Sequence, residues 1–506
     1  MTPKLRYLPL LALTAALAAC SGDVRQAAGP RADADGLLRY GGITFEPCAL
    51  SASGNLSVEA QCATLEVPEN HDDPEGRKIS LALALIPASG MAEADPVYMI
   101  AGGPGQSALE SYPMLHAAFS DVRRKRHVIL VDARGTGGSN PLHCPMSEGD
   151  EAMFSDPEAE TPEAMRAFTE RCRDKLAEKA DLRFYTTGDH IRDLDLVRQT
   201  LGVERINLVG VSYGTRVAQQ YAATYPQQTR TVVLDSVVPN TLVLGQEHAR
   251  NLEDALDVHF ARCQQDKACA TNLGNPREQL ERVRDRLQAG GIAPVRYRDP
   301  VSGEWREEVP NFGHLAGPLR MYSYQPTASA MLPLVLHEAA QERYESLLAQ
   351  SRMLSNQLGD SMALGMGLSV SCAEDVSELK RNDADDGTVL GSALVDLLVA
   401  QCEVWPKGTR AENFRTPLSG DVAVLAISGE YDPVTPPRYG DEVIEHLPKG
   451  RHLVLPGQGH SVLGTGCMPK LFAQFVESAD AASLDAECLQ RLSALPPFSG
   501  NHGWEP

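Results

Sequence analysis

The sequence has 506 residues, of which 43% are hydrophobic and 22% are charged, as in ordinary soluble globular proteins. Its formal net charge is −21, and this argues against a nucleic-acid partner, because phosphate binding requires a basic face. The length accommodates roughly two to four domains, or one large domain with an insertion.

The first predicted element is an N-terminal export segment. Lys4 and Arg6 precede an uncharged run over residues 8–19. The run is shorter than the ~20 residues that span a bilayer, and it is typical of a signal peptide. It ends in Leu-Ala-Ala-Cys, which resembles the lipobox of bacterial lipoproteins. We therefore expect cleavage of residues 1–19, lipidation of Cys20 and a tether over 20–36.

The lipid on Cys20 would anchor the protein in the bacterial cell envelope. Two or more acyl chains hold a protein on a membrane where a single chain does not. Through the same resemblance, Ser21 implies the outer membrane, with the protein facing the periplasm or the exterior. Ordinary cleavage after Ala18 or Ala19 is the alternative, and it would release a secreted protein.

From residue 37 onward, short apolar runs alternate with helical stretches. The runs cover 79–87, 97–102, 127–132, 206–212, 231–236, 422–428 and 452–456. This pattern predicts an α/β fold, with a mostly parallel central sheet and helices on both faces. Ligands of such sheets bind beyond the carboxyl ends of the strands, so the residues that follow these runs are candidate site residues.

The strand pattern stops between residues 240 and 417, where helical stretches such as 328–350 dominate. We interpret 240–417 as a helical cap, or lid, inserted between late strands. The core is then divided into a first part, 37–239, and a second part, 418–506.

Ten cysteines remain once Cys20 is set aside, and an even number is typical of disulfides in exported proteins. The spacings of zinc ligands are absent, so we predict no metal site. Composition leaves the connectivity open, but local spacing favours the pairs Cys48–Cys62, Cys144–Cys172, Cys263–Cys269, Cys372–Cys402 and Cys467–Cys488.

The segment 208–217 places Ser212 in a Gly-x-Ser-x-Gly motif between a strand and a helix. In this setting the serine sits on a sharp turn at a helix N-terminus, as a nucleophile does. The alternative is a serine that only caps the helix. We expect the backbone N–H of Tyr213 to donate to an oxyanion, and a second donor from the glycine-rich loop 101–107, at Gly103 or its neighbour.

An acid and a base follow in the chain order of this fold. Asp432 follows the run 422–428, and His460 follows the run 452–456. We predict that His460 takes the proton of Ser212 and that Asp432 orients the imidazole. Glu430 is the nearest rival acid.

Together these segments resemble the α/β-hydrolases of the tripeptidyl-aminopeptidase and proline-iminopeptidase type. The resemblance rests on 101–105, 131–144, 210–216, 429–437 and 457–460, and it extends from about Phe45 to Cys488. It implies a serine hydrolase without a cofactor that cuts short peptides from the N-terminus. One departure is Ala101, where proline iminopeptidases usually carry histidine.

Several charged residues receive structural or binding assignments. We expect Asp132 and Arg134 to pair and fix a turn, and Arg216 to serve packing or an ion pair. An aminopeptidase must hold a cationic amino terminus, so Glu374 and Asp375 in the cap are candidate substrate ligands. The alternative for both is a solvated acidic face.

Three functions remain open at this point. The first is an exo-aminopeptidase acting through an acyl-enzyme, the second is an esterase or amidase for small molecules, and the third is a binding protein on a hydrolase scaffold. The expected partners are a small peptide or ester and, through the lipid alone, a membrane. The sequence does not predict the oligomeric state.

Overall fold

The computed structural model describes residues 29–32, 36–52, 56–146 and 161–504. The predicted signal peptide, Cys20 and most of the predicted tether lie outside these ranges. Within the described ranges, no helix has both the length and the apolar character needed to cross a membrane.

A single large sheet forms the core, in the strand order β1-β2-β3-β4-β5-β7-β6-β8-β9-β12-β13. The six strands from β7 to β13 in this order pair in parallel, and the strands β1 to β5 pair antiparallel at one edge. This arrangement confirms the predicted α/β fold. The strands are β1 (Arg31–Ala32), β2 (Leu38–Tyr40), β3 (Ile43–Ala52), β4 (Leu56–Pro68), β5 (Lys78–Ile86), β6 (Val97–Ile100), β7 (Val128–Val131), β8 (Ile206–Val211), β9 (Thr229–Asp235), β12 (Ala423–Gly429) and β13 (Gly450–Leu455).

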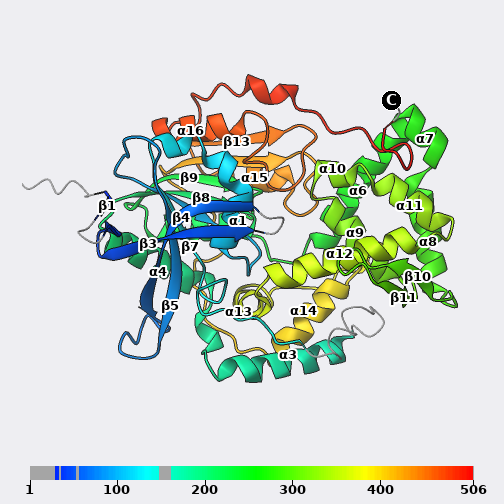
Figure 1. Ribbon diagram of the computed structural model, residues 1–506, viewed down its shortest axis with the longest axis horizontal. Coiled ribbons are helices and arrows are strands. Elements are labelled where there is room, and N and C mark those ends of the chain that lie inside the picture. The colour runs from blue at the N-terminus through cyan, green and yellow to red at the C-terminus, as the bar shows by residue number, and fades with distance from the viewer. Residues whose placement is uncertain (1–28, 33–35, 53–55, 147–160, 505–506) are drawn as a thin grey trace, which may run out of the picture.

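Helices cover both faces of this sheet (Figure 1). On one face, side chains of α4, α5 and α15 join the buried cluster that includes Leu194, Val217 and Val443. On the other face, α1 and α16 contribute Tyr112 and Phe472 to a second buried cluster. The bounds are α1 (Ala108–Leu115), α3 (Pro162–Ala177), α4 (Thr187–Leu201), α5 (Tyr213–Thr224), α15 (Pro437–Ile444) and α16 (Met468–Ser478), with short 3-10 turns η1 (His116–Phe119), η2 (Val122–Arg124), η3 (Leu182–Phe184) and η5 (Glu487–Arg491).

The cap lies between β9 and β12 in the chain, on the right in Figure 1, and has a buried apolar cluster of its own. It is not wholly helical, because β10 and β11 form an antiparallel pair. The stretch 328–350 is divided among α10, α11 and α12, with Glu342 at φ 56° in the last break. The elements are α6 (His248–Gln265), α7 (Lys267–Leu273), α8 (Pro276–Gln288), β10 (Val295–Arg298), β11 (Trp305–Glu308), α9 (Phe312–Tyr322), α10 (Pro326–Ser329), α11 (Leu332–Ala340), α12 (Glu345–Ser361), α13 (Leu364–Glu374), η4 (Asp383–Asp385) and α14 (Ala393–Val404).

Two segments outside 240–417 join the cap. Helix α3 packs on α14, and both lie below the core in Figure 1. A C-terminal strap, residues 495–503, runs across to α7. Within it, the N–H of Phe498 donates to Ala330 O (2.8 Å), and Asn272 Nδ2 donates to Ser499 O (3.1 Å). The cap is therefore attached to the rest of the chain at more than its two ends.

All five disulfides favoured by local spacing are present. They pair Cys48–Cys62, Cys144–Cys172, Cys263–Cys269, Cys372–Cys402 and Cys467–Cys488. Five disulfides are typical of proteins that mature in an oxidising compartment outside the cytoplasm.

The expected pairing of Asp132 with Arg134 is wrong, although both residues are structural. Asp132 accepts from Ser107 Oγ (2.6 Å) and from the Leu109 N–H (3.0 Å), and so holds the start of α1. Arg134 instead donates to both carboxylate oxygens of Asp193 (2.7 Å each), on α4. The two side chains follow β7 but serve different neighbours, which their adjacency in the sequence did not reveal.

Candidate active site

Ser212 occupies the sharp turn between β8 and α5. Its backbone has φ 55° and ψ −124°, a conformation that residues other than glycine rarely adopt. Its N–H donates to Asp235 O (2.8 Å), at the end of the neighbouring strand β9, and its carbonyl accepts from Thr215. Backbone strain of this kind is stored at functional sites when the surrounding structure enforces it.

The glycines of the motif allow this turn to form. A Cβ atom at Gly214 would lie 2.4 Å from Ile100 O, and one at Gly210 would lie 2.3 Å from Gly214 O. Both distances are far shorter than any normal contact, and the obstructing atoms are backbone atoms. The first turn of α5 can therefore approach β6 and β8 only because these two positions lack side chains.

The glycine-rich loop after β6 faces Ser212 across the same site. Gly103 has φ 109°, and both Gly103 and Pro104 line a pocket with Ser212 and Tyr213. Tyr213 begins α5, so its N–H has no acceptor within the helix. The arrangement brings the two predicted oxyanion donors, Gly103 and Tyr213, to the wall of one pocket.

His460 and Asp432 form a direct pair beyond the ends of β13 and β12. His460 Nδ1 lies 2.8 Å from Asp432 Oδ2. Burial opposes ionisation of Asp432, but His460 and the N–H groups of Thr435 and Val434 outweigh it, and the pKa of Asp432 lies below its ordinary value. Burial disfavours the charged form of His460, but Asp432 outweighs it and raises the pKa of His460 above 6.5.

The rival acid does not reach this histidine. Glu430 Oε2 accepts the N–H of Gly457 (2.7 Å), in the loop that follows β13. Asp441, the other nearby acid, lies on α15 and pairs with His452 (2.8 Å) on β13.

Two residues that the sequence reasoning missed hold the histidine and its acid. Thr435 Oγ1 donates to Asp432 Oδ2 (2.8 Å) and lies 3.3 Å from His460 Nδ1. The carboxylate of Asp235 accepts the N–H groups of Val462 (2.9 Å) and Leu463 (2.9 Å), which follow the histidine. Asp235 therefore holds both parts of the site: its carboxylate binds the loop after His460, and its backbone carbonyl accepts the N–H of Ser212.

The pocket in front of Ser212 has a volume of about 390 Å³. One wall is apolar and comes from α3, α13 and α14, with Met165, Leu364, Leu394, Leu397 and Leu398. The lining also includes a polar group, His248 at the start of α6, Arg320 in the last turn of α9 and Tyr324 just after α9, and we call this group the polar wall. The sequence reasoning missed these three polar residues, because nothing in the local pattern marks them as pocket residues.

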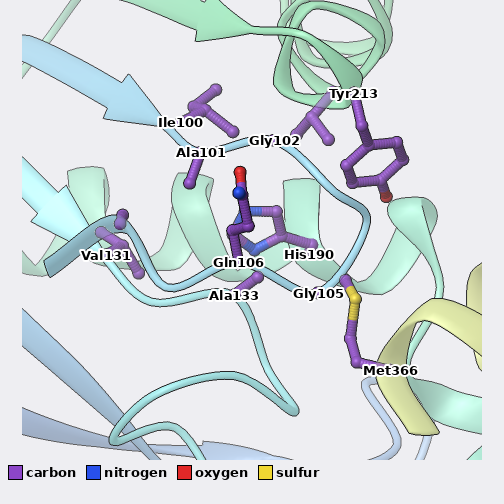
Figure 2. A pocket seen from close by; sticks show the side chains of 12 residues that line it. Ile100, Ala101, Gly102, Gly105, Gln106, Val131, Ala133, His190, Tyr213 and Met366 are labelled. Atoms are coloured by element: carbon purple, nitrogen blue, oxygen red, sulfur yellow. The ribbon is translucent and has the colours of Figure 1, made fainter. Parts of the chain in front are cut away.

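A second cavity, of only about 10 Å³, lies behind the glycine-rich loop. Figure 2 shows Gln106 and His190 facing one another beneath this loop, with Ala101 beside them. Burial lowers the pKa of His190 to about 4, so its imidazole is neutral at pH 7. Ala101, the departure from the iminopeptidase pattern, therefore faces this small cavity. The larger pocket is the one that can admit a substrate.

The prediction that Glu374 and Asp375 bind a substrate amine is wrong. Both are fully buried. Glu374 accepts from Thr187 N (2.7 Å) and Thr187 Oγ1 (2.8 Å), and Asp375 pairs with Arg216 (3.2 Å) and Arg415 (2.9 Å). Burial and the neighbouring Asp375 raise the pKa of Glu374 to about 7. These two carboxylates anchor the end of α13. The ion pair of Arg216 is the one that it forms with Asp375.

No group of three or more His, Cys, Asp or Glu side chains in the described part of the chain could hold a metal ion.

Comparison with known families defines the class of the protein. Residues 95–265 match the model described as alpha/beta hydrolase fold, and residues 388–488 match the model described as TAP-like protein. The chain has the α/β-hydrolase fold, and its C-terminal part is similar to TAP-like proteins. Ser212 lies in the first matched region, and Asp432 and His460 lie in the second.

Three curated relatives have names that describe an activity more specifically. Serine protease Hip1 of Mycobacterium tuberculosis (strain ATCC 25618 / H37Rv) is 25% identical over 490 residues, which cover 88% of this chain and 91% of the relative. Tripeptidyl aminopeptidase of Streptomyces lividans is 32% identical over 211 residues, covering 39% and 38%. Carboxylesterase B of Mycobacterium tuberculosis (strain CDC 1551 / Oshkosh) is 31% identical over 224 residues, covering 42% and 43%.

Proposed function

We propose that the protein is a serine hydrolase that acts through a covalent acyl-enzyme on Ser212. The observation that carries this proposal is the hydrogen bond between Asp432 and His460, at 2.8 Å. This pair lies beyond the carboxyl ends of the parallel strands, as does the strained turn of Ser212. A serine, a histidine and a carboxylate in these roles constitute a catalytic triad.

In the first step, Ser212 Oγ attacks the carbonyl carbon while His460 Nε2 takes its proton. The buried carboxylate of Asp432 stabilises the imidazolium, in accordance with the raised pKa of His460. His460 then returns the proton to the departing amine or alcohol, and an ester to Ser212 remains. Water, activated by the same imidazole, hydrolyses that ester and regenerates the serine.

The negative charge on the tetrahedral intermediate requires fixed donors. The N–H of Tyr213, at the start of α5, and an N–H of the loop at Gly103 supply them. The positive end of the helix dipole adds to their effect. One such donor is worth about 10²- to 10³-fold in kcat.

We infer that the substrates are short peptides, cut near their N-terminus. The names of two relatives, a serine protease and a tripeptidyl aminopeptidase, support peptide bonds as the target. The pocket of about 390 Å³ suits a few residues rather than a folded chain. Since Glu374 and Asp375 are committed elsewhere, they do not supply the carboxylate that would hold a free amino terminus.

Hydrolysis of small esters is the second candidate function. The apolar wall formed by α3, α13 and α14 would accept an acyl chain, and one relative is named carboxylesterase. A binding protein on a hydrolase scaffold is the third. We further propose that lipidated Cys20 holds the enzyme in the cell envelope.

A fluorophosphonate probe and a substrate panel test these functions together. We expect the probe to label the wild type and not Ser212→Ala. Aminoacyl and tripeptidyl anilides, assayed beside simple esters, then separate peptidase from esterase. A wild-type protein that the probe does not label, and that cuts nothing in the panel, would be a binding protein.

A further inference from the structure

A cation without a carboxylate partner lies in the pocket in front of Ser212. Arg320, in the last turn of α9, is partly buried there. No described aspartate or glutamate pairs with it, although acidic residues outnumber Lys and Arg by 67 to 46 in the whole sequence. The other described arginines near the pocket differ, since Arg216 and Arg415 both pair with Asp375. Among the described residues Arg320 therefore has no carboxylate partner, and a side-chain hydrogen bond joins it to Tyr324.

The groups around Arg320 do not neutralise it. Tyr324, just after the end of α9, hydrogen-bonds Arg320, and His248 also belongs to the polar wall. Burial, Arg320 and His460 together lower the pKa of His248 to about 3, so its imidazole is uncharged at neutral pH. No aspartate or glutamate lines the pocket among the described residues. The site therefore offers a guanidinium and neutral donors to a ligand, and these select an anion.

The position of Arg320 indicates which part of a substrate it meets. Tyr324 stacks edge-on against His460, with ring centroids 5.1 Å apart, and its carbonyl accepts the His460 N–H (2.8 Å). His460 gives its proton to the departing group, so that group must lie against this histidine. The wall that carries Tyr324 and Arg320 is thus on the departing side, and the apolar wall from α3, α13 and α14 remains for the acyl side.

We propose that Arg320 binds a carboxylate on the departing part of the substrate. The enzyme would then prefer short peptides whose released fragment ends in a free α-carboxylate, with an apolar residue on the acyl side. This inference rests on the proposed acyl-enzyme function. Water is the one further reactant: the amide bond breaks, the ester to Ser212 forms and the serine proton leaves with the amine, and water then hydrolyses the ester and restores the serine.

Matched peptides test the proposal. Peptides of two to four residues are prepared as free acids and as C-terminal amides, and kcat/KM is measured at pH 7.5. A charge-assisted bond to Arg320 should make the acids about 10- to 100-fold better substrates than the amides. Arg320→Gln should remove this preference by slowing the acids alone, and Arg320→Lys should keep part of it. Arg343→Gln, on an exposed arginine paired with Glu338, is the matched control and should change nothing.

A second pair of substrates extends the test to ester hydrolysis. Two aryl esters that differ only in a carboxylate or a carboxamide on the departing phenol should show the same preference. Equal kcat/KM for acids and amides in the wild type, in both series, would overturn the proposal. So would an equal loss of both forms in Arg320→Gln, because it would indicate a structural role.

Labelling by a neutral fluorophosphonate separates this inference from the proposed function. A wild-type rate of Ser212 labelling in Arg320→Gln would show that the variant is folded and that its triad is intact. If the wild type itself is not labelled and cuts neither series, the acyl-enzyme function fails, and the role of Arg320 fails with it. If labelling is normal but no carboxylate preference exists, the inference alone is wrong.

Discussion

The imidazole of His460 is held by a separate neighbour on each side. Asp432 and Thr435 contact Nδ1, the ring of Tyr324 packs against its face, and Asp235 fixes the two residues that follow Ser461. Only Asp432 among these follows from the chain order of triad residues. Thr435 lies three residues after Asp432 in the same turn, whereas Tyr324 comes from a cap turn and Asp235 from the end of β9. The contributions of Tyr324 and Asp235 therefore depend on tertiary packing.

The first prediction distinguishes the two acids near the end of β12. Asp432→Asn should lower kcat about 10³- to 10⁴-fold, because the imidazole loses the carboxylate that sets its tautomer and stabilises its charge. Glu430→Gln should change kcat by no more than about twofold, since its bond to the Gly457 N–H needs only an acceptor oxygen. Steady-state kinetics on one substrate check both variants. The reverse order of effects would exclude Asp432 as the orienting acid.

The second prediction concerns pH. Only the neutral imidazole of His460 can accept the serine proton, so activity should fall as the pH falls through the pKa of His460. Because that pKa is raised above 6.5, the acidic half-point of kcat/KM should lie above pH 6.5. In Asp432→Asn the half-point should move to lower pH, since the stabilising charge is gone. A wild-type half-point at or below 6.5 would contradict the electrostatics of the site.

At the scale of elements, the apolar runs predicted the strands that build the site. Strands β6, β7, β8 and β12 are almost wholly buried and therefore read as continuous apolar sequence. Strands β2, β3 and β4 were not predicted, because they alternate between exposed and buried positions at the antiparallel edge. The hairpin β10–β11 was missed for a similar reason, since its residues are mostly polar and only Tyr297 is buried.

The contrast between local sequence pattern and tertiary packing also explains which site residues were predicted and which were missed. Ser212 and Asp432 follow buried parallel strands, and His460 follows the edge strand β13. The carboxyl ends of these parallel strands point to the same side of the sheet. Arg320 lies on a cap helix, and its place in the pocket depends on how that helix packs. The partners of Glu374 and Asp375 come from α4, α5 and the segment after α14, far away in the sequence, so their burial could not be read from their own neighbourhood.

The third prediction concerns the disulfide Cys372–Cys402, which joins α13 to α14 behind the apolar wall. Replacing both cysteines by serine should lower the free energy of unfolding by about 3–4 kcal/mol, because the bond closes a loop of 30 residues. It should also raise KM, since the wall loosens, while fluorophosphonate still labels Ser212. Denaturant unfolding and steady-state kinetics check these outcomes.

The disulfide Cys263–Cys269 provides the control for this experiment. It closes a loop of only six residues, between α6 and α7, and does not line the pocket. The corresponding double serine variant should lose less stability and keep the wild-type KM. An equal rise of KM in both variants would show that the effect is not specific to the wall.

At the scale of the whole molecule, the C-terminal strap adds a connection between the core and the cap. The chain enters the cap after β9 and leaves it before β12, and the C-terminal strap runs to it along the top of Figure 1. The disulfide Cys467–Cys488 fixes the chain shortly before the strap begins. Arg262 donates to the carbonyl of Leu495, and Phe498 stacks edge-on against Trp504 at 5.1 Å.

The fourth prediction follows from these contacts. Truncation after residue 494 removes the strap but leaves every residue of the proposed triad. The cap should then be cut faster by trypsin under native conditions, because the part around α6, α7 and α10 loses three hydrogen bonds, while Ser212 is still labelled. Cleavage sites mapped by mass spectrometry should fall within 240–417. Unchanged cleavage kinetics would mean that the strap lies on the cap without stabilising it.

The strap also limits how this protein can be recombined with its relatives. Exchanging only residues 240–417 would join a foreign cap to a strap shaped for another surface, and leave Leu495, Phe498 and Ser499 without their acceptors and donors. A chimera that keeps cap and strap from the same parent preserves that fit. Substrate choice therefore depends on segments that are distant in the gene, since α3 also lines the pocket through Met165. We expect specificity to be transferred only when the cap, the strap and α3 are moved together.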